Sequence, residues 1–264
     1  MWRLSAGPVS LALLAPYVEE ALSDEDATYR VFLDDVILTW AGWERTLDIR
    51  AIGVRAFSAD GMVLAQVPEM AVVLSVPALA RGMIAPTHLD LFAVTLRLVR
   101  RADGWIELGL GDDQDSGDVM VESLLGDLLA PPNPDREMGY MQRVTVLGAR
   151  VIVTDEQLEA VWQAPSADIV LERGGRGIEA ELDLILSLGE SEIAVEATAS
   201  HDRATGVIEA AARFSDFDPS SLARMTPRLS DLAEIRLPIA GEIGFEIGID
   251  GQLRDARFDI DGGP

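Results

Sequence analysis

Apolar and polar residues alternate along several segments of this 264-residue chain, and this alternation limits its possible folds more than any other feature. In the clearest segment, one face would carry Ile239, Gly241, Ile243, Phe245, Ile247 and Ile249, and the other Ala240, Glu242, Gly244, Glu246, Gly248 and Asp250. A second segment would place Ile178, Ala180, Leu182, Leu184, Leu186 and Leu188 opposite Glu179, Glu181, Asp183, Ile185 and Ser187. Successive side chains of a β-strand point to opposite faces of its sheet, so this period predicts strands with one apolar side and one water-facing side.

Other segments of the chain have strand-like patterns of the same kind. The predicted strands cover residues 28–40, 45–57, 62–76, 87–101, 105–110, 142–154, 167–172, 177–189, 192–201, 206–214, 237–250 and 253–261. Hairpin dipeptides separate some of them, as at Asp60-Gly61 and Asp250-Gly251. Helices are predicted at residues 9–22, 78–81, 119–130 and 219–233, the last begun by Asp218 and Pro219. The predicted fold is therefore mainly β: a long curved antiparallel sheet, a groove or taco-like meander, with an N-terminal helix and a few short helices.

The chain is predicted to have four parts. Residues 1–26 form the N-terminal helix, and residues 27–130 form a first β segment with a closing helix. Residues 131–141 begin with Pro131-Pro132-Asn133-Pro134, which stops a helix, and are predicted to be a linker. Residues 142–264 form a second β segment.

Charge and composition exclude several classes of partner and chemistry. The formal net charge is −24 and all 21 basic residues are Arg, so phosphate backbones would repel the chain and nucleic acid is not an expected partner. Cys is absent, which removes disulfides, thiolate catalysis and Cys-ligated zinc. A transmembrane helix needs a run of about 18 apolar residues, and the sequence contains no such run. The apolar stretch at residues 4–18 is compatible with a signal-peptide core, a membrane-proximal amphipathic helix or a packing helix.

Motifs of catalysis are also missing. No nucleophile elbow, phosphate loop, dinucleotide fingerprint or paired-histidine metal motif occurs, and His88 and His201 are interpreted as ordinary histidines on or beside strands. The acidic turn at residues 111–118 does not fit a calcium loop, because Asp118 occupies the position of the required glycine and Leu124 that of the final glutamate. We therefore expect no enzymatic activity, no metal and no cofactor.

Several short segments, spread over most of the chain, have turn residues and apolar residues at the positions seen in a known protein family; none of them is a catalytic signature. These segments are WRLSAGPVSL at residues 2–11, DGMVLA at 60–65, LSVPALARG at 74–82, LRLVRRADG at 96–104, WQAPSADIVL at 162–171, RFS at 213–215 and PIAG at 238–241. They are similar to the AsmA-like superfamily of bacterial envelope proteins, especially its YhdP-type members. The resemblance implies the N-terminal periplasmic portion of such a protein, anchored to the inner membrane by a helix that this chain lacks.

The same resemblance implies a function in lipid transport and outer-membrane biogenesis. A periplasmic groove with an apolar concave face would hold phospholipid acyl chains during transfer between the inner and outer membranes. The implied partners are these acyl chains and further groove repeats of the same parent chain. The candidate residues lining the groove are Phe92, Val94, Leu96, Leu182, Leu184, Leu186, Ile243, Phe245 and Ile247.

Alternation alone leaves other functions open. A sheet covered by its own helices or by a second sheet gives the same pattern as an open groove. One alternative is therefore a non-enzymatic β-sandwich module of the cell envelope, structural or interacting, with a closed core. Another is a soluble carrier with a closed pocket for one apolar ligand.

Overall fold

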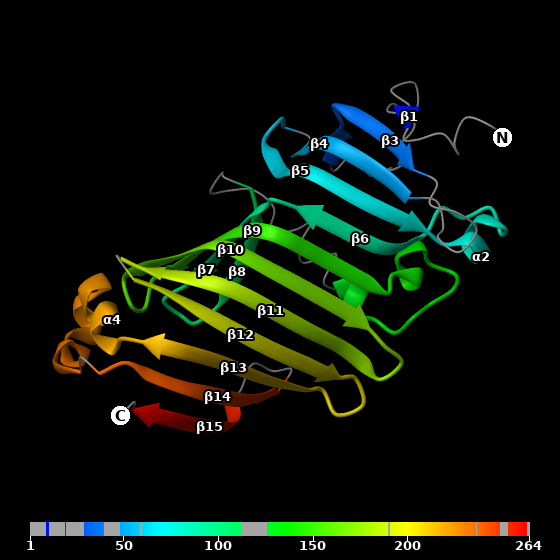
Figure 1. Cartoon of the computed structure of the whole chain (residues 1–264). Coiled ribbons are helices and arrows are strands. Elements are labelled where there is room, and N and C mark those ends of the chain that lie inside the picture. Colours follow the sequence, from blue (N-terminus) through cyan, green and yellow to red (C-terminus); the bar gives the residue numbers. More distant parts are fainter. Residues whose placement is uncertain are drawn as a thin grey trace. The chain divides into compact units, whose positions relative to one another are not determined.

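The computed structural model describes residues 9–10, 19, 29–39, 48–58, 60–111, 126–189, 191–235, 237–248 and 253–262. Over these residues the chain is mainly β, with mostly antiparallel strands in an unclosed sheet and a few short helices (Figure 1), which confirms the predicted fold class. The chain divides into two compact units. The first comprises residues 1–95 and 108–147, and the second comprises residues 96–107 and 148–264. The predicted linker at residues 131–141 lies within the first unit.

The first unit contains the strands of the N-terminal half. They are β1 (Val9–Ser10), β2 (Tyr29–Phe32), β3 (Asp35–Thr39), β4 (Asp48–Ser58), β5 (Val63–Leu74) and β6 (Pro86–Phe92). Their order in the sheet is β1, β3, β4, β5 and β6, while β2 also pairs with β4. The edge of β6 pairs in parallel with the first residues of β9 (Arg143–Asp155).

The structure corrects the prediction of a helix at residues 9–22 at its start. Val9 and Ser10, the predicted start of a helix, form strand β1 and pair with Leu38 and Ile37 of β3. A β-branched residue such as Val9 suits a strand, and pairing with a neighbouring strand outweighs a weak helical pattern. Of the remaining residues of that predicted helix, only Glu19 is described, and it is helical.

Two segments predicted as continuous strands are each divided. The strand predicted at residues 28–40 is interrupted between β2 and β3, where the Asp34 backbone N–H donates to the Ile52 carbonyl at 2.9 Å. The strand predicted at residues 87–101 is interrupted at Ala93, which has a φ of +53°. This left-handed conformation is unusual for a residue with a Cβ, and it breaks the alternation of faces at that point.

The second unit contains most of the longer strands. They are β10 (Ala160–Arg173), β11 (Gly177–Leu188), β12 (Ser191–Asp202), β13 (Val207–Phe217), β14 (Ile239–Gly248) and β15 (Leu253–Gly262). Each pairs antiparallel with the next, and Figure 1 shows them side by side in this order. The hairpin of β7 (Thr95–Arg100) and β8 (Ile106–Leu110) borders β9, with which β7 pairs.

The described helices are short and carry the expected caps. Helix α2 (Val76–Leu79) is capped by Ser75, and α4 (Pro219–Met225) by Asp218, whose side chain accepts from the Ser220 N–H. The 3₁₀ segments are η3 (Glu137–Tyr140) and η4 (Pro227–Glu234). The predicted helix at residues 119–130 is described only near its end, where residues 126–129 are helical. In the described portion of the chain, every helix is too short or too polar to span a bilayer.

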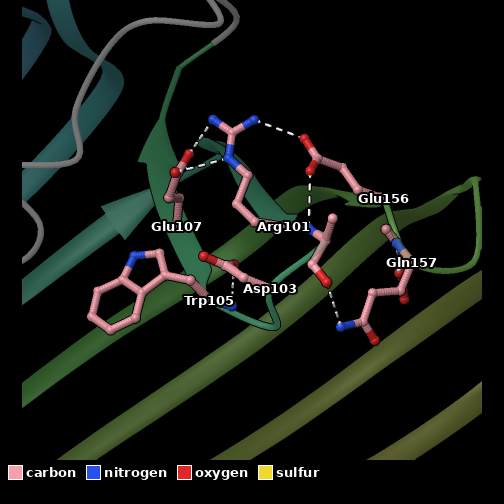
Figure 2. A network of polar contacts seen from close by, with 8 residues as sticks. Arg101, Asp103, Trp105, Glu107, Glu156 and Gln157 are labelled. Atoms are coloured by element: carbon pink, nitrogen blue, oxygen red, sulfur yellow. Dashed lines mark hydrogen bonds and ion pairs between the residues drawn. The ribbon is translucent and has the colours of Figure 1, made fainter.

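A network of exposed polar groups joins two turns of the second unit (Figure 2). The Arg101 guanidinium donates to Glu107 through Nε at 2.8 Å and to Glu156 through Nη1 at 2.8 Å. Glu156 also accepts from the Ala102 N–H at 3.0 Å, and the Gln157 side chain donates to the Ala102 carbonyl at 3.2 Å. These contacts join the turn between β7 and β8 to the turn after β9. The carboxylates raise the pKa of Arg101, first through the hydrogen bond to Glu107.

Candidate functional site

On one side of the sheet, strands β11 to β15 carry mostly apolar side chains, and we call this side the apolar face. Directly paired residues in antiparallel strands project to the same side of the sheet, so the registers define its rows. Four rows cross the five strands: Leu184, Val195, Phe214, Gly241 and Ile260; Leu182, Ala197, Ala212, Ile243 and Phe258; Ala180, Ala199, Ala210, Phe245 and Ala256; and Ile178, His201, Ile208, Ile247 and Leu253. His201 is the one polar residue in these rows.

Six of the nine predicted lining residues lie on the apolar face and remain partly accessible. The structure places Leu182, Leu184 and Leu186 on β11, and Ile243, Phe245 and Ile247 on β14, with each side chain half-buried. A fully covered core would leave such residues buried. Only at the end of the face near α4 are its described apolar side chains fully buried. There α4 contacts β11, and Leu188 of β11 and Ile193 of β12 are buried.

The other three predicted lining residues lie elsewhere. Val94 and Leu96 are buried, so they belong to the packed interior. Phe92 follows the buried Leu91 in β6 and therefore points to the opposite face, where it pairs with Glu69 and Leu147. The Arg50 guanidinium lies 5.8 Å from the centre of the Phe92 ring, a cation–π contact. The irregular backbone at Ala93 explains why these three residues do not continue one face.

The opposite side of β11 to β15, which we call the acidic face, carries mostly acids and small residues. Its rows are Asp183, Glu196, Arg213, Glu242 and Asp259; Glu181, Thr198, Ala211, Gly244 and Arg257; and Glu179, Ser200, Glu209, Glu246 and Asp255. The Arg213 Nε donates to Glu242 at 2.6 Å, and this hydrogen bond and the carboxylate charge raise the pKa of Arg213. The last row itself contains no Arg, so Glu209, Glu246 and Asp255 lie directly opposite one another. Of these three, only Asp255 has an ion pair in the described structure, with Arg257 two residues along β15 at 2.9 Å.

The acidic face is also the hollowed one. A hollow of about 690 Å³ is lined mostly by residues of its rows, among them Glu179, Glu209, Glu246 and Arg257. The resemblance implied an apolar concave face, whereas this hollow presents carboxylates and would attract cations rather than acyl chains. The described residues form no cluster of His, Cys, Asp or Glu suited to a metal ion.

The two histidines have different surroundings. The Nδ1 atom of His88 lies 3.0 Å from the Thr87 hydroxyl. His201 lies between Ile178 and Ile208 on the apolar face, and both its ring nitrogens are buried without a hydrogen-bond partner in the described structure. Neither arrangement resembles an acid–base pair, because no carboxylate is hydrogen-bonded to either ring in the described structure.

Sequence reasoning identified the apolar strand faces but missed two features of the site. It did not find which side of the sheet is hollowed, although small residues at Ala211 and Gly244 mark the middle of that side. It predicted the strand at residues 253–261 but did not assign Phe258 and Ile260 to the apolar face, on which the register with β14 places them.

Comparison of the chain with protein-family models, curated proteins and solved structures found no match. The resemblance to envelope proteins therefore stays a prediction from the sequence, and the function has to be argued from the sheet itself.

Proposed function

We propose that the chain is a non-enzymatic lipid-binding segment whose apolar face holds phospholipid acyl chains. The observation that carries this proposal is the partial exposure of Leu182, Leu184, Ile243 and Phe245 in the middle of an aliphatic sheet face. Moving an alkyl chain from water to such a surface is favourable by about 0.8 kcal/mol for each methylene that is buried. An aliphatic surface supplies this free energy without specific polar contacts, so an acyl chain could occupy many positions along it.

The geometry favours an open surface over a deep trough. The hollow of the second unit lies on the acidic face, so acyl chains would lie along the rows of the other side. Phospholipid transfer between the inner and outer membranes, in the periplasm, is the role that the resemblance to AsmA-like proteins implies for such a surface. We propose this role for a longer assembly to which the chain would contribute one segment.

The alternative function is a closed β-sandwich module of the cell envelope. A closed core predicts that the middle of the apolar face is as buried as its end, where Leu188 and Ile193 lie near α4. Leu184 and Ile243 are instead half-buried, which favours an accessible surface.

The proposal is tested by two substitutions of neighbouring residues on β11. Leu184→Arg places a charge on the apolar face, whereas Ile185→Arg places the same charge on the acidic face, where Ile185 is already 41% exposed. Native mass spectrometry of the purified chain should show bound phospholipid in the parent and in Ile185→Arg, and little or none in Leu184→Arg. Ile243→Arg on β14 should behave as Leu184→Arg does.

Circular dichroism and thermal unfolding show whether each variant is folded. Loss of folding in both Leu184→Arg and Ile243→Arg, with a normal Ile185→Arg, would support the closed core. Absence of phospholipid from the folded parent, including after incubation with phospholipid vesicles, would overturn the proposed function.

A further inference from the structure

One edge of strand β15 (Leu253–Gly262) is unpaired among the residues that the structure describes. The strand pairs with β14 along its length, and no other strand of the described structure pairs with it. An unpaired edge presents backbone N–H and C=O groups that can pair with a strand of another chain. Proteins usually block such edges with a very short strand, with Pro, with charged side chains or with a covering loop. β15 has ten residues and no Pro, and its charged residues are of both signs: Arg254, Asp255, Arg257, Asp259 and Asp261.

The apolar side chains of this edge strand are largely exposed to solvent. Leu253, Phe258 and Ile260 are 60%, 64% and 50% exposed, and their pairing partners place them on the apolar face. The Phe258 ring meets the Phe245 ring of β14 edge-to-face, with a centroid distance of 6.3 Å, which leaves its outer side open. The apolar face therefore continues to the last strand without a side chain that ends it.

We propose that β15 pairs antiparallel with β15 of a second copy of this chain, around a two-fold axis at Phe258. In this register Phe258 lies opposite Phe258 of the partner subunit, and Ala256 lies opposite Ile260 of the partner subunit. On the acidic face Arg257 then lies opposite Asp259 of the partner subunit, and the two-fold axis repeats this pair. Such isologous pairing is the usual way in which identical chains form closed dimers.

Charge complementarity within β15 selects a second copy as the partner. The acidic face of β11 to β15 holds Arg213 and Arg257 among many acids, and Arg257 is the one on the free edge strand. An antiparallel copy brings two such arginines against two aspartates. The same register sets Asp255 opposite Asp261 of the partner subunit, but the Arg257 Nε lies 2.9 Å from the Asp255 carboxylate and offsets part of its charge.

The pairing is expected to be weak and dependent on salt. Two strands of ten residues bury less surface than the roughly 1,000 Å² typical of a stable interface. Two chains of formal charge −24 also repel each other over long distances, and salt screens this repulsion more than it weakens a close ion pair. Dimerisation should therefore increase with protein concentration and with moderate salt.

The first test is cross-linking of single cysteines, which the absence of native Cys makes clean. Phe258→Cys should form a disulfide-linked dimer on mild oxidation, whereas Ile185→Cys, an exposed aliphatic position on β11 away from the edge, should stay monomeric. Equal cross-linking of the two variants would show random collision and overturn the proposal.

The second test is a charge exchange followed by analytical ultracentrifugation over a concentration series. Arg257→Asp or Asp259→Arg alone turns two attractive pairs into repulsive ones and should weaken dimerisation about tenfold. The double variant Arg257→Asp/Asp259→Arg restores both pairs across the axis and should recover dimerisation. A parent chain that stays monomeric at all concentrations, or a double variant no better than the single ones, would overturn the proposal. Neither result bears on lipid binding, which is measured separately.

Discussion

His201 is a polar residue in an apolar environment. Its ring nitrogens are buried without partners in the described structure, between Ile178 and Ile208. A buried polar group without a hydrogen bond costs stability, and an apolar replacement of similar size removes that cost. We expect His201→Leu to raise the free energy of unfolding by about 1 kcal/mol, as measured by urea denaturation.

The other histidine supplies a matched control. The Nδ1 atom of His88 is 3.0 Å from the Thr87 hydroxyl, so His88→Leu removes a hydrogen bond and should lower the free energy of unfolding by about 1 kcal/mol. If His201→Leu lowered the free energy of unfolding as much as His88→Leu does, the His201 imidazole would have a stabilising contact in solution. Our interpretation of its environment would then be wrong.

The Asp202 carboxylate stabilises the turn between β12 and β13 by accepting hydrogen bonds from the backbone of that turn. Its Oδ1 accepts from the Ala204 N–H at 2.8 Å and from the Thr205 N–H at 3.1 Å. These hydrogen bonds, with the one from Thr205 first, lower the pKa of Asp202 below its ordinary value. A lowered folded-state pKa means that the folded chain binds the proton less tightly than the unfolded chain does.

The stabilisation by Asp202 should therefore depend on pH in a defined direction. It is fully present above the ordinary Asp pKa of about 3.9 and is lost as pH falls through the lower folded-state pKa. Asp202→Asn should unfold more easily than the parent at neutral pH, and the difference should disappear in strong acid. Thermal unfolding of both chains between neutral pH and about pH 2 measures this, and a difference that stays constant would contradict it.

At the scale of elements, Thr226 fixes the connection of α4 and η4 to the β9–β10 turn. Its buried hydroxyl donates to the Leu158 carbonyl and accepts from the Arg228 N–H at 3.3 Å. Thr226→Val keeps the shape but leaves both backbone groups without this partner. The free energy of unfolding should fall by roughly 1–3 kcal/mol.

Hydrogen exchange across residues 219–234 and urea denaturation check this effect. Thr198→Val is the matched control, because Thr198 is exposed on the acidic face of β12 and its change should stay within about 0.5 kcal/mol. Equal effects of the two substitutions would show that the Thr226 hydroxyl does not hold the connection.

The elements differ in how well the sequence predicted them. Strands β11 to β14 were found because their alternation is regular, and α4 because Asp218 and Pro219 form a standard helix start. The prediction failed where tertiary contacts decide the backbone. Ala93 adopts a positive φ that no local signal announces, and β10 begins at Ala160, before a Pro165 that normally argues against a strand.

The candidate site, like the elements, was predicted from the sequence only in part. The alternation gave the apolar residues of β11 and β14, because the period alone assigns a face. Which face becomes hollow depends on how the paired strands twist together, and this property belongs to the whole sheet. The direction of the hollow and the open edge at β15 could therefore be learned only from the structure.

At the scale of the whole molecule, the formal charge of −24 acts against folding, and rows of the acidic face concentrate this effect. Glu246 of β14 lies between Glu209 and Asp255 in its row, while Glu242 on the same face of the same strand is hydrogen-bonded to Arg213 at 2.6 Å. Like charges directly opposite in a sheet are destabilising, and opposite charges are stabilising. The two glutamates should therefore respond in opposite ways to neutralisation.

Glu246→Gln should raise the free energy of unfolding by about 0.5 kcal/mol at low salt, because it removes repulsion from two neighbours. Glu242→Gln should lower stability, because Arg213 loses its charged partner. The melting temperature of the parent should rise with added salt, since salt screens its self-repulsion, and the gain from Glu246→Gln should shrink in parallel. Thermal unfolding of the three chains from about 10 mM to 1 M salt separates these effects. Equal shifts for both glutamates would mean that net charge alone matters, and that the cross-strand register of the acidic face has no influence on stability.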